Sequence, residues 1–149
     1  RDSAGERPHR VCQVFASGLP IQYFKGTKLT DWEPLARAQL EGSMEATVRC
    51  GAAMARHRGG RVTVFLTALG TGAFGNPASW LCSAIEGAVA ACAEHPVDVR
   101  LVHFSSVPPK GSVYDSMEER IQKRLKALVR KGNDKQGKYE ERPADGGTN

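Results

Sequence analysis

A strand that runs directly into a glycine-rich loop and a helix start is the feature that most constrains this chain. Residues 61–67 are β-branched and apolar almost without interruption, which is typical of a central strand covered on both faces. Residues 70–75 then hold three glycines, and Asn76 and Pro77 follow them. Asn is favoured at a helix N-cap and Pro at the first helical position. This stretch therefore predicts a strand, a tight loop and a helix in direct succession.

The other apolar patterns predict an alternation of strands and helices. β-Branched runs predict strands over residues 11–16 and 97–104, and apolar residues at helical spacing predict helices over residues 30–56 and 77–93. A last, basic helix is expected to start with a cap at Ser112 or Asp115. Strands that alternate with helices form parallel sheets with helices on their faces. We therefore expect a three-layer α/β/α fold with a small, mainly parallel sheet.

The first long helix carries both a start signal and a buried stripe. Residues 30–33 have the S/T-x-x-E form of a capping box, in which Glu33 is the reciprocal partner of Thr30. One apolar stripe at helical spacing is expected to face the core. Its members are Leu35, Leu40, Met44, Val48, Gly51 and Ala55.

Length and composition predict one domain. The chain has 149 residues, 40% of them hydrophobic and 25% charged. We expect the domain to cover residues 11–131, between a polar N-terminal arm (1–10) and a polar, disordered tail (132–149). The chain opens without Met, so we expect a fragment or a processed product. Whether an N-terminal half of the fold precedes it stays open.

Net charge and cysteine content limit the classes of ligand and the cellular setting that we expect for this chain. The net charge of +5 permits an acidic ligand or nucleic acid without demanding either. No apolar run approaches the length of a membrane span, and no clustered ligands predict a metal or cofactor site. The cysteines form no CxxC pair and each lies in an apolar or helical context, so we expect buried, reduced thiols in a cytoplasmic protein. These cysteines are Cys12, Cys50, Cys82 and Cys92.

The glycine-rich loop predicts an anion-binding site. Backbone N–H groups point outward at a helix N-terminus, and the helix dipole favours negative charge there. Residues 70–75 fit G-x-G-x-x-G, but a Rossmann site requires an acidic residue at the end of the next strand, and residues 102–105 hold none. A P-loop is excluded because no Gly-Lys-Ser/Thr follows. We therefore expect a phosphate or diphosphate cradle of another type.

The strand, the loop of residues 70–77 and the following helix resemble the second ligand loop of macrodomains, the ADP-ribose-binding α/β/α family. The preceding helix, with Trp32 to Arg37, resembles a macrodomain-like subgroup in which such a helix leads into a GGGAFGN-like loop. The resemblance covers residues 11–104 and implies that loop N–H groups hold the diphosphate while Phe74 packs against the distal ribose. The ligand-binding residues that it implies are Gly70, Thr71, Gly72, Ala73, Phe74, Gly75 and Asn76.

Other residues are also candidates for the site. Ser17 and Gly18 end the first predicted strand at the sheet edge where the loop should lie, so they either line the pocket or only form a turn. Glu33 is the candidate that would activate water if the protein is a hydrolase, and its alternative role is the capping box. His103 is expected to pack within its strand rather than act as a base.

Two functions follow from these expectations. The first is binding of ADP-ribose or a related phosphorylated nucleotide at the loop, extended in one version to hydrolysis of ADP-ribose linkages. The second is a non-catalytic domain whose basic last helix or exposed sheet edge binds protein or RNA. A nucleic-acid partner is disfavoured, because acidic residues interrupt the basic helix and stacking aromatics are scarce there.

Overall fold

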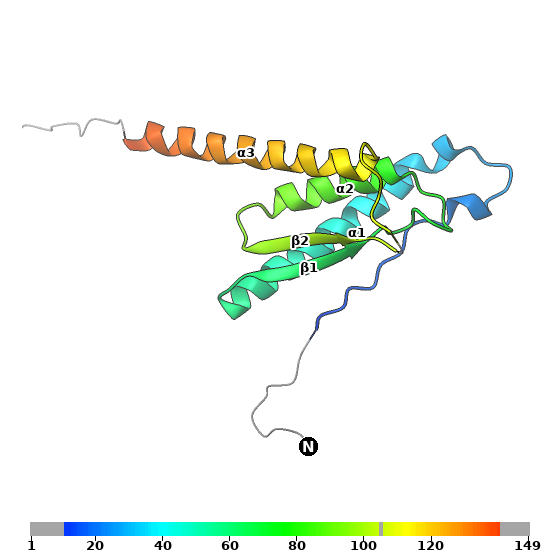
Figure 1. The fold of residues 1–149 in the computed structure, drawn as a ribbon, viewed down its shortest axis with the longest axis horizontal. Coiled ribbons are helices and arrows are strands. Elements are labelled where there is room, and N and C mark those ends of the chain that lie inside the picture. Colours follow the sequence, from blue (N-terminus) through cyan, green and yellow to red (C-terminus); the bar gives the residue numbers. More distant parts are fainter. Residues whose placement is uncertain (1–10, 105, 141–149) are drawn as a thin grey trace, which may run out of the picture.

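The computed structural model describes residues 11–104 and 106–140. Strands and helices alternate after a single short 3₁₀ turn, so the α/β character predicted from the sequence is confirmed (Figure 1). The predicted arm, residues 1–10, and residues 141–149 of the predicted tail lie outside the described residues. The elements are η1 (Ile21–Tyr23), α1 (Leu29–Arg58), β1 (Val62–Thr67), α2 (Ala78–Ala91), β2 (Val97–Val102) and α3 (Val113–Glu140).

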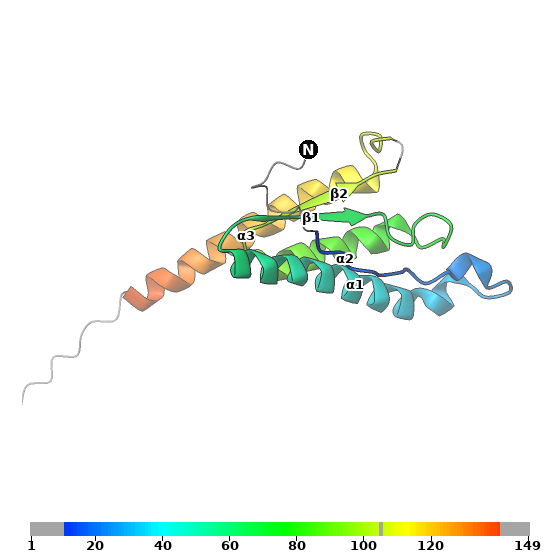
Figure 2. The same cartoon turned by 90° about the horizontal axis from the view of Figure 1, so that it is seen from below.

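The two strands form a parallel sheet, as expected for strands joined by a helical crossover. Val62 pairs with Val97, and Thr67 pairs with Val102 at the other end of the ladder. Helices α1 and α2 lie on the same side of the strands (Figure 2). Burial therefore alternates along β1, and Phe65 on the opposite face is 64% exposed. The prediction that this strand is covered on both faces is wrong, because a nearly continuous apolar run does not reveal which faces gain a covering layer.

The core forms where α1 and α2 meet the sheet. Gly51 of α1 lies so close to β1 that a Cβ built on it would stand 2.3 Å from Val64 Cγ2. The absent side chain therefore lets the helix approach the strand. The predicted stripe of α1 is buried except at Leu35, which is 58% exposed and where the prediction is wrong. The largest fully buried side chains are Leu40, Leu81, Ile85, Val48 and Cys82.

Residues 11–16 are not a strand, although their sequence predicted one. None of them pairs with β1 in the ladder of the described residues, and Phe15 is 91% exposed. The segment is instead held at its end, where Gln39 Nε2 on α1 donates to the Ser17 carbonyl at 2.8 Å. An apolar, β-branched run favours a strand only where a neighbouring edge accepts its hydrogen bonds.

The capping box of α1 lies two residues before the predicted one, with Lys28 rather than Thr30 at the N-cap position. The Lys28 N–H donates to Asp31 Oδ2 at 2.9 Å, so Asp31 takes the reciprocal role that the sequence assigned to Glu33. Glu33 instead accepts from Arg37 Nε at 2.7 Å, one helical turn later. The capping-box prediction is wrong in register, because two acidic residues compete for one helix start.

Helix α3 packs on α2 and continues past Gly132, where the composition placed the start of the tail. Met117 is buried against the core, and Arg120 forms an ion pair with Glu86 of α2 at 2.6 Å. The hydrogen bond to Glu86 raises the pKa of the Arg120 guanidinium above its ordinary value. Within the described part of the chain, no helix has the length and apolar character that crossing a bilayer requires.

The prediction that all four cysteines are buried is confirmed for two of them and wrong for the other two. Cys82 and Cys92 are buried, whereas Cys12 and Cys50 are exposed. Burial raises the pKa of the Cys82 thiol, which keeps it in the unreactive protonated form at neutral pH.

We therefore expect the native protein to react at Cys12 and Cys50 within minutes of adding a thiol-specific aromatic disulfide reagent. Cys82 and Cys92 should react only after unfolding in guanidinium chloride. Absorbance of the released thiolate counts the reacting groups, and peptide mapping identifies them. Equal rates at all four thiols would contradict the burial of Cys82 and Cys92.

A candidate anion-binding loop

The glycine loop, residues 70–76, is held in shape by the Asn76 side chain. Its Nδ2 donates to the Leu19 carbonyl at 2.8 Å and to the Gly70 carbonyl at 2.9 Å. Asn76 is only 2% exposed, and its Oδ1 is buried without a hydrogen-bond partner among the described residues. Helix α2 begins one residue later than predicted, with Pro77 at the N-cap position. The prediction that Asn76 caps this helix is therefore wrong, because its amide joins two backbone segments instead.

Gly18 and Gly70 make this junction possible. A Cβ at Gly18 would stand 2.7 Å from the Gly70 Cα, and a Cβ at Gly70 would stand 2.8 Å from Asn76 Nδ2. Gly70 also adopts a φ of 74°, which disfavours other residues. The structure thus brings Gly18 against the loop, as expected from its place in the sequence. Ser17 is exposed, and its Oγ donates to the Gly18 carbonyl.

The middle of the loop presents backbone donors that no described residue accepts from. The Thr71 N–H donates to the Ala68 carbonyl at 3.3 Å, and the Gly75 N–H donates to the Gly72 carbonyl at 3.0 Å. Those of Gly72, Ala73 and Phe74 make no hydrogen bond to any described residue. Gly72 and Ala73 are also exposed to solvent. Consecutive free donors next to a helix N-terminus form the arrangement that binds phosphates and carboxylates.

An aromatic pair stands beside these donors. The rings of Phe74 and Tyr23 pack edge to face, with centroids 6.0 Å apart and planes at 76°. The Gln22 N–H donates to the Phe74 carbonyl at 3.3 Å, so η1 is attached to the loop. Tyr23 is 61% exposed and is the functional candidate that sequence reasoning missed. The aromatic content of residues 21–29 was the one signal for it.

Arg37 of α1 lies near the first turn of α2, and Glu33 is paired with it. The Arg37 guanidinium lies 5.2 Å from the centre of the Trp80 ring, in the first turn of α2. Trp80 is buried and belongs to the core. Glu33 accepts its hydrogen bond from Arg37 through Oε1, so its carboxylate forms a half-exposed ion pair with Arg37 within α1.

The remaining candidates lie elsewhere. His103 packs edge to face against Tyr114 of α3, at 5.0 Å between centroids, which is a packing role. Across the described ranges, no three His, Cys, Asp or Glu side chains gather in a group suited to a metal ion.

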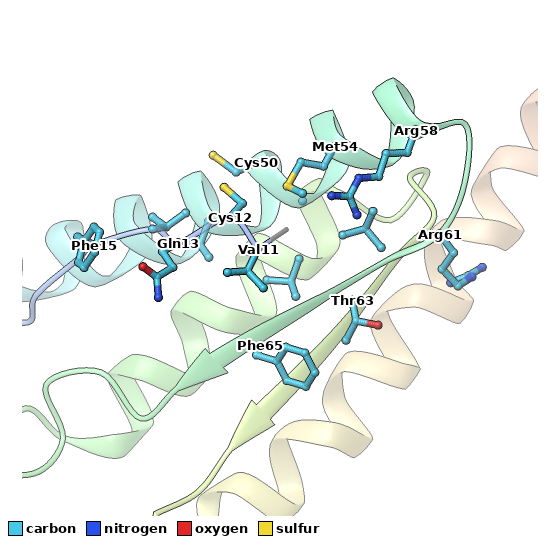
Figure 3. A pocket seen from close by; sticks show the side chains of 15 residues that line it. Val11, Cys12, Gln13, Phe15, Cys50, Met54, Arg58, Arg61, Thr63 and Phe65 are labelled. Carbon is cyan, nitrogen blue, oxygen red and sulfur yellow. The ribbon is translucent and has the colours of Figure 1, made fainter. Parts of the chain in front are cut away.

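A groove of about 550 Å³ also lies away from the glycine loop (Figure 3). Residues 11–15 form one wall, and the free edge of β1 from Arg61 to Phe65 forms the other. Residues of α1, including Cys50 and Met54, form its floor. No residue of the glycine loop lines it, so it is separate from the candidate anion site.

Comparisons of the chain with protein-family models, with curated proteins and with solved structures found no match.

Proposed function

We propose that the glycine loop binds ADP-ribose or a related phosphorylated nucleotide through its diphosphate. The observation that carries this proposal is the run of free N–H groups at Gly72, Ala73 and Phe74, next to the N-terminus of α2. The resemblance of the loop to the second ligand loop of macrodomains points to the same ligand class. A complete three-layer α/β/α architecture and a cytoplasmic setting belong to this proposal as well.

The residues divide into donors, walls and supports. The three free N–H groups receive the phosphate oxygens, and α2 adds its dipole. The half-buried Phe74 and the exposed Tyr23 together offer an apolar surface on which a ribose can pack. Asn76 acts as a support, because its amide is already occupied by the carbonyls of Leu19 and Gly70.

Binding is proposed without a hydrolytic step. A hydrolase requires a group that can take a proton from water within hydrogen-bond reach of the substrate. Glu33, the candidate from the sequence, is held by Arg37. The Glu33–Arg37 pair near the start of α2 carries no net charge, so the attraction for an anion comes from the loop N–H groups and the helix dipole.

The proposal is tested by calorimetric titration with ADP-ribose, for which we expect a micromolar dissociation constant. Gly72→Glu should weaken binding about ten-fold or more, because it places a carboxylate among the donors that receive the phosphate. Gly72 is the suitable position, since a Cβ there meets nothing within 4 Å and its φ is not positive. Gly75→Glu is less informative, because a φ of 75° and the nearby Gln22 side chain strain any substitution.

Gly72→Gln is the matched control, because it adds the same bulk without the charge. It should bind more tightly than Gly72→Glu, and the difference should shrink as salt is added. Equal affinities for the two variants would contradict a phosphate cradle. Failure of the unmodified protein to give heat or thermal stabilisation with ADP-ribose or AMP would overturn the proposal.

A non-catalytic interaction domain is the second candidate, favoured by the uncovered face of the sheet. Phe65 of β1 and Phe104 after β2 are both exposed, and α3 presents basic side chains such as Lys123. Salt-sensitive RNA binding without any response to nucleotides would favour this function over the first. Lys123→Glu together with Arg124→Glu should then reduce RNA binding, since both side chains are exposed.

A further inference from the structure

The segment of residues 11–16 runs along α1 and passes close to an exposed cysteine (Figure 2). Ser17, which follows the segment, accepts a hydrogen bond from Gln39 of α1. Residues 11–16 themselves carry no ladder hydrogen bonds to the described sheet. Cys12 and Cys50 line the same groove, and both are exposed. Figure 3 shows both side chains on the α1 side of this groove, with their sulfur atoms directed toward the same end.

The hydrogen bond at Ser17 sets which residue of α1 lies opposite Cys12. The segment and the helix run in opposite directions in both views (Figures 1 and 2). Five residues of extended chain, from Ser17 back to Cys12, span about 16 Å. The eleven residues from Gln39 to Cys50 rise by about 16 Å along the helix. They also turn by about three full turns, so Gln39 and Cys50 share one side of α1.

We propose that Cys12 and Cys50 are a redox site, which a low-molecular-weight disulfide such as oxidised glutathione converts to an intramolecular disulfide. The matching spans of segment and helix place the two thiols at the same level of α1. The missing ladder bonds leave residues 11–16 free to adjust to the distance that a disulfide requires.

The reaction is a pair of thiol–disulfide exchanges. One cysteine thiolate attacks a sulfur of oxidised glutathione, forming a mixed disulfide and releasing one glutathione thiolate. The second cysteine thiolate attacks the protein sulfur of that mixed disulfide, forming the Cys12–Cys50 bond and releasing the second glutathione. Two protein thiols are oxidised, two glutathiones are produced, and the protein loses two hydrogens.

The other two cysteines do not compete for the oxidant. Cys82 and Cys92 are buried, and burial raises the pKa of Cys82. The disulfide would fasten residues 11–16 to α1, directly before Gly18 and Leu19. Gly18 packs against Gly70, and the Leu19 carbonyl accepts a hydrogen bond from Asn76 of the glycine loop. Oxidation therefore restrains the segment that precedes these two loop contacts.

The experiment incubates the native full chain with excess oxidised glutathione and reads the product by intact mass. The expected product is lighter by about 2 Da and monomeric on a non-reducing gel. A tryptic digest under non-reducing conditions should then contain the peptide of residues 11–25 linked by a disulfide to the peptide of residues 50–56. The melting temperature should rise by about 5 °C and return on adding a reducing agent.

Cys12→Ser and Cys50→Ser should each stop at the mixed disulfide, heavier by about 305 Da. Cys92→Ala is the matched control and should still form the Cys12–Cys50 bond. Glutathione adducts at both Cys12 and Cys50, dimers linked between chains, or a bond from Cys50 to a buried cysteine would each overturn the proposal. None of these readouts depends on a nucleotide, so the result stands apart from the proposed function.

Discussion

Replacing Gly51 by Ala is expected to lower the free energy of unfolding by about 1–3 kcal/mol, although Ala is the better helix former. Gly51 lies in the interior of α1 and is buried against β1. The added Cβ would stand 2.3 Å from Val64 Cγ2 and 3.6 Å from Val97 Cγ1. Val64 is a branched side chain with few rotamers, so it cannot move aside at little cost. Helix and strand must therefore separate, and contacts across the core are lost.

Gly42→Ala in the same helix is the matched control. A Cβ at Gly42 meets nothing within 4 Å. The substitution should therefore raise the free energy of unfolding by about 0.5–1 kcal/mol, as expected from helix propensity alone. Urea denaturation followed by circular dichroism measures both variants. Stabilisation by Gly51→Ala similar to that by Gly42→Ala would show that α1 does not approach β1 as closely as described.

Much of the fold could be predicted from local patterns, because helix periodicity and β-branched runs reflect local preference. The strands over residues 62–67 and 97–102 and the long helix after residue 29 follow from such patterns. Residues 11–16 have the same local pattern and form no strand. Their state depends on whether a neighbouring edge accepts hydrogen bonds, and that information lies elsewhere in the chain.

The candidate site could be predicted only in part, for the same reason. The glycines of residues 70–75 indicated a tight loop at a helix start, and the structure has one. That Asn76 would hold this loop to Leu19 could not be read from the sequence, since the two residues are 57 positions apart. Tyr23 was missed in the same way, because its packing on Phe74 depends on where η1 attaches.

Asn76→Asp is expected to destabilise the protein by about 3 kcal/mol or more at neutral pH, the largest single effect that we predict. The substitution keeps the shape of the side chain but replaces the Nδ2 donor by a carboxylate oxygen. That oxygen would face the Leu19 and Gly70 carbonyls at the present distances of 2.8 and 2.9 Å. Two acceptors lose their donor, and a charge is buried at a position that is 2% exposed.

The pH dependence of this variant has a definite sign. Burial beside two carbonyl oxygens raises the pKa of the introduced carboxyl above its value in the unfolded chain, about 3.9. The folded state then holds its proton more tightly than the unfolded state. The penalty is smallest below the unfolded pKa and grows as the pH rises toward the folded pKa. Unfolding in urea at pH 5 and pH 8 should show the larger loss at pH 8.

Ser79→Asp separates this effect from the mere addition of negative charge near α2. Ser79 is exposed in the first turn of the helix, where a carboxylate interacts favourably with the dipole. It should raise the free energy of unfolding by about 0.3–1 kcal/mol, the opposite direction from Asn76→Asp. Asn76→Ala should cost less than Asn76→Asp, because it removes the donor without burying a charge. If both Asn76 variants were as stable as the unmodified protein, the loop would keep its shape without this clamp. Asn76 would then not be the residue that holds the loop, and another contact would have to keep the N–H groups of residues 72–74 in place.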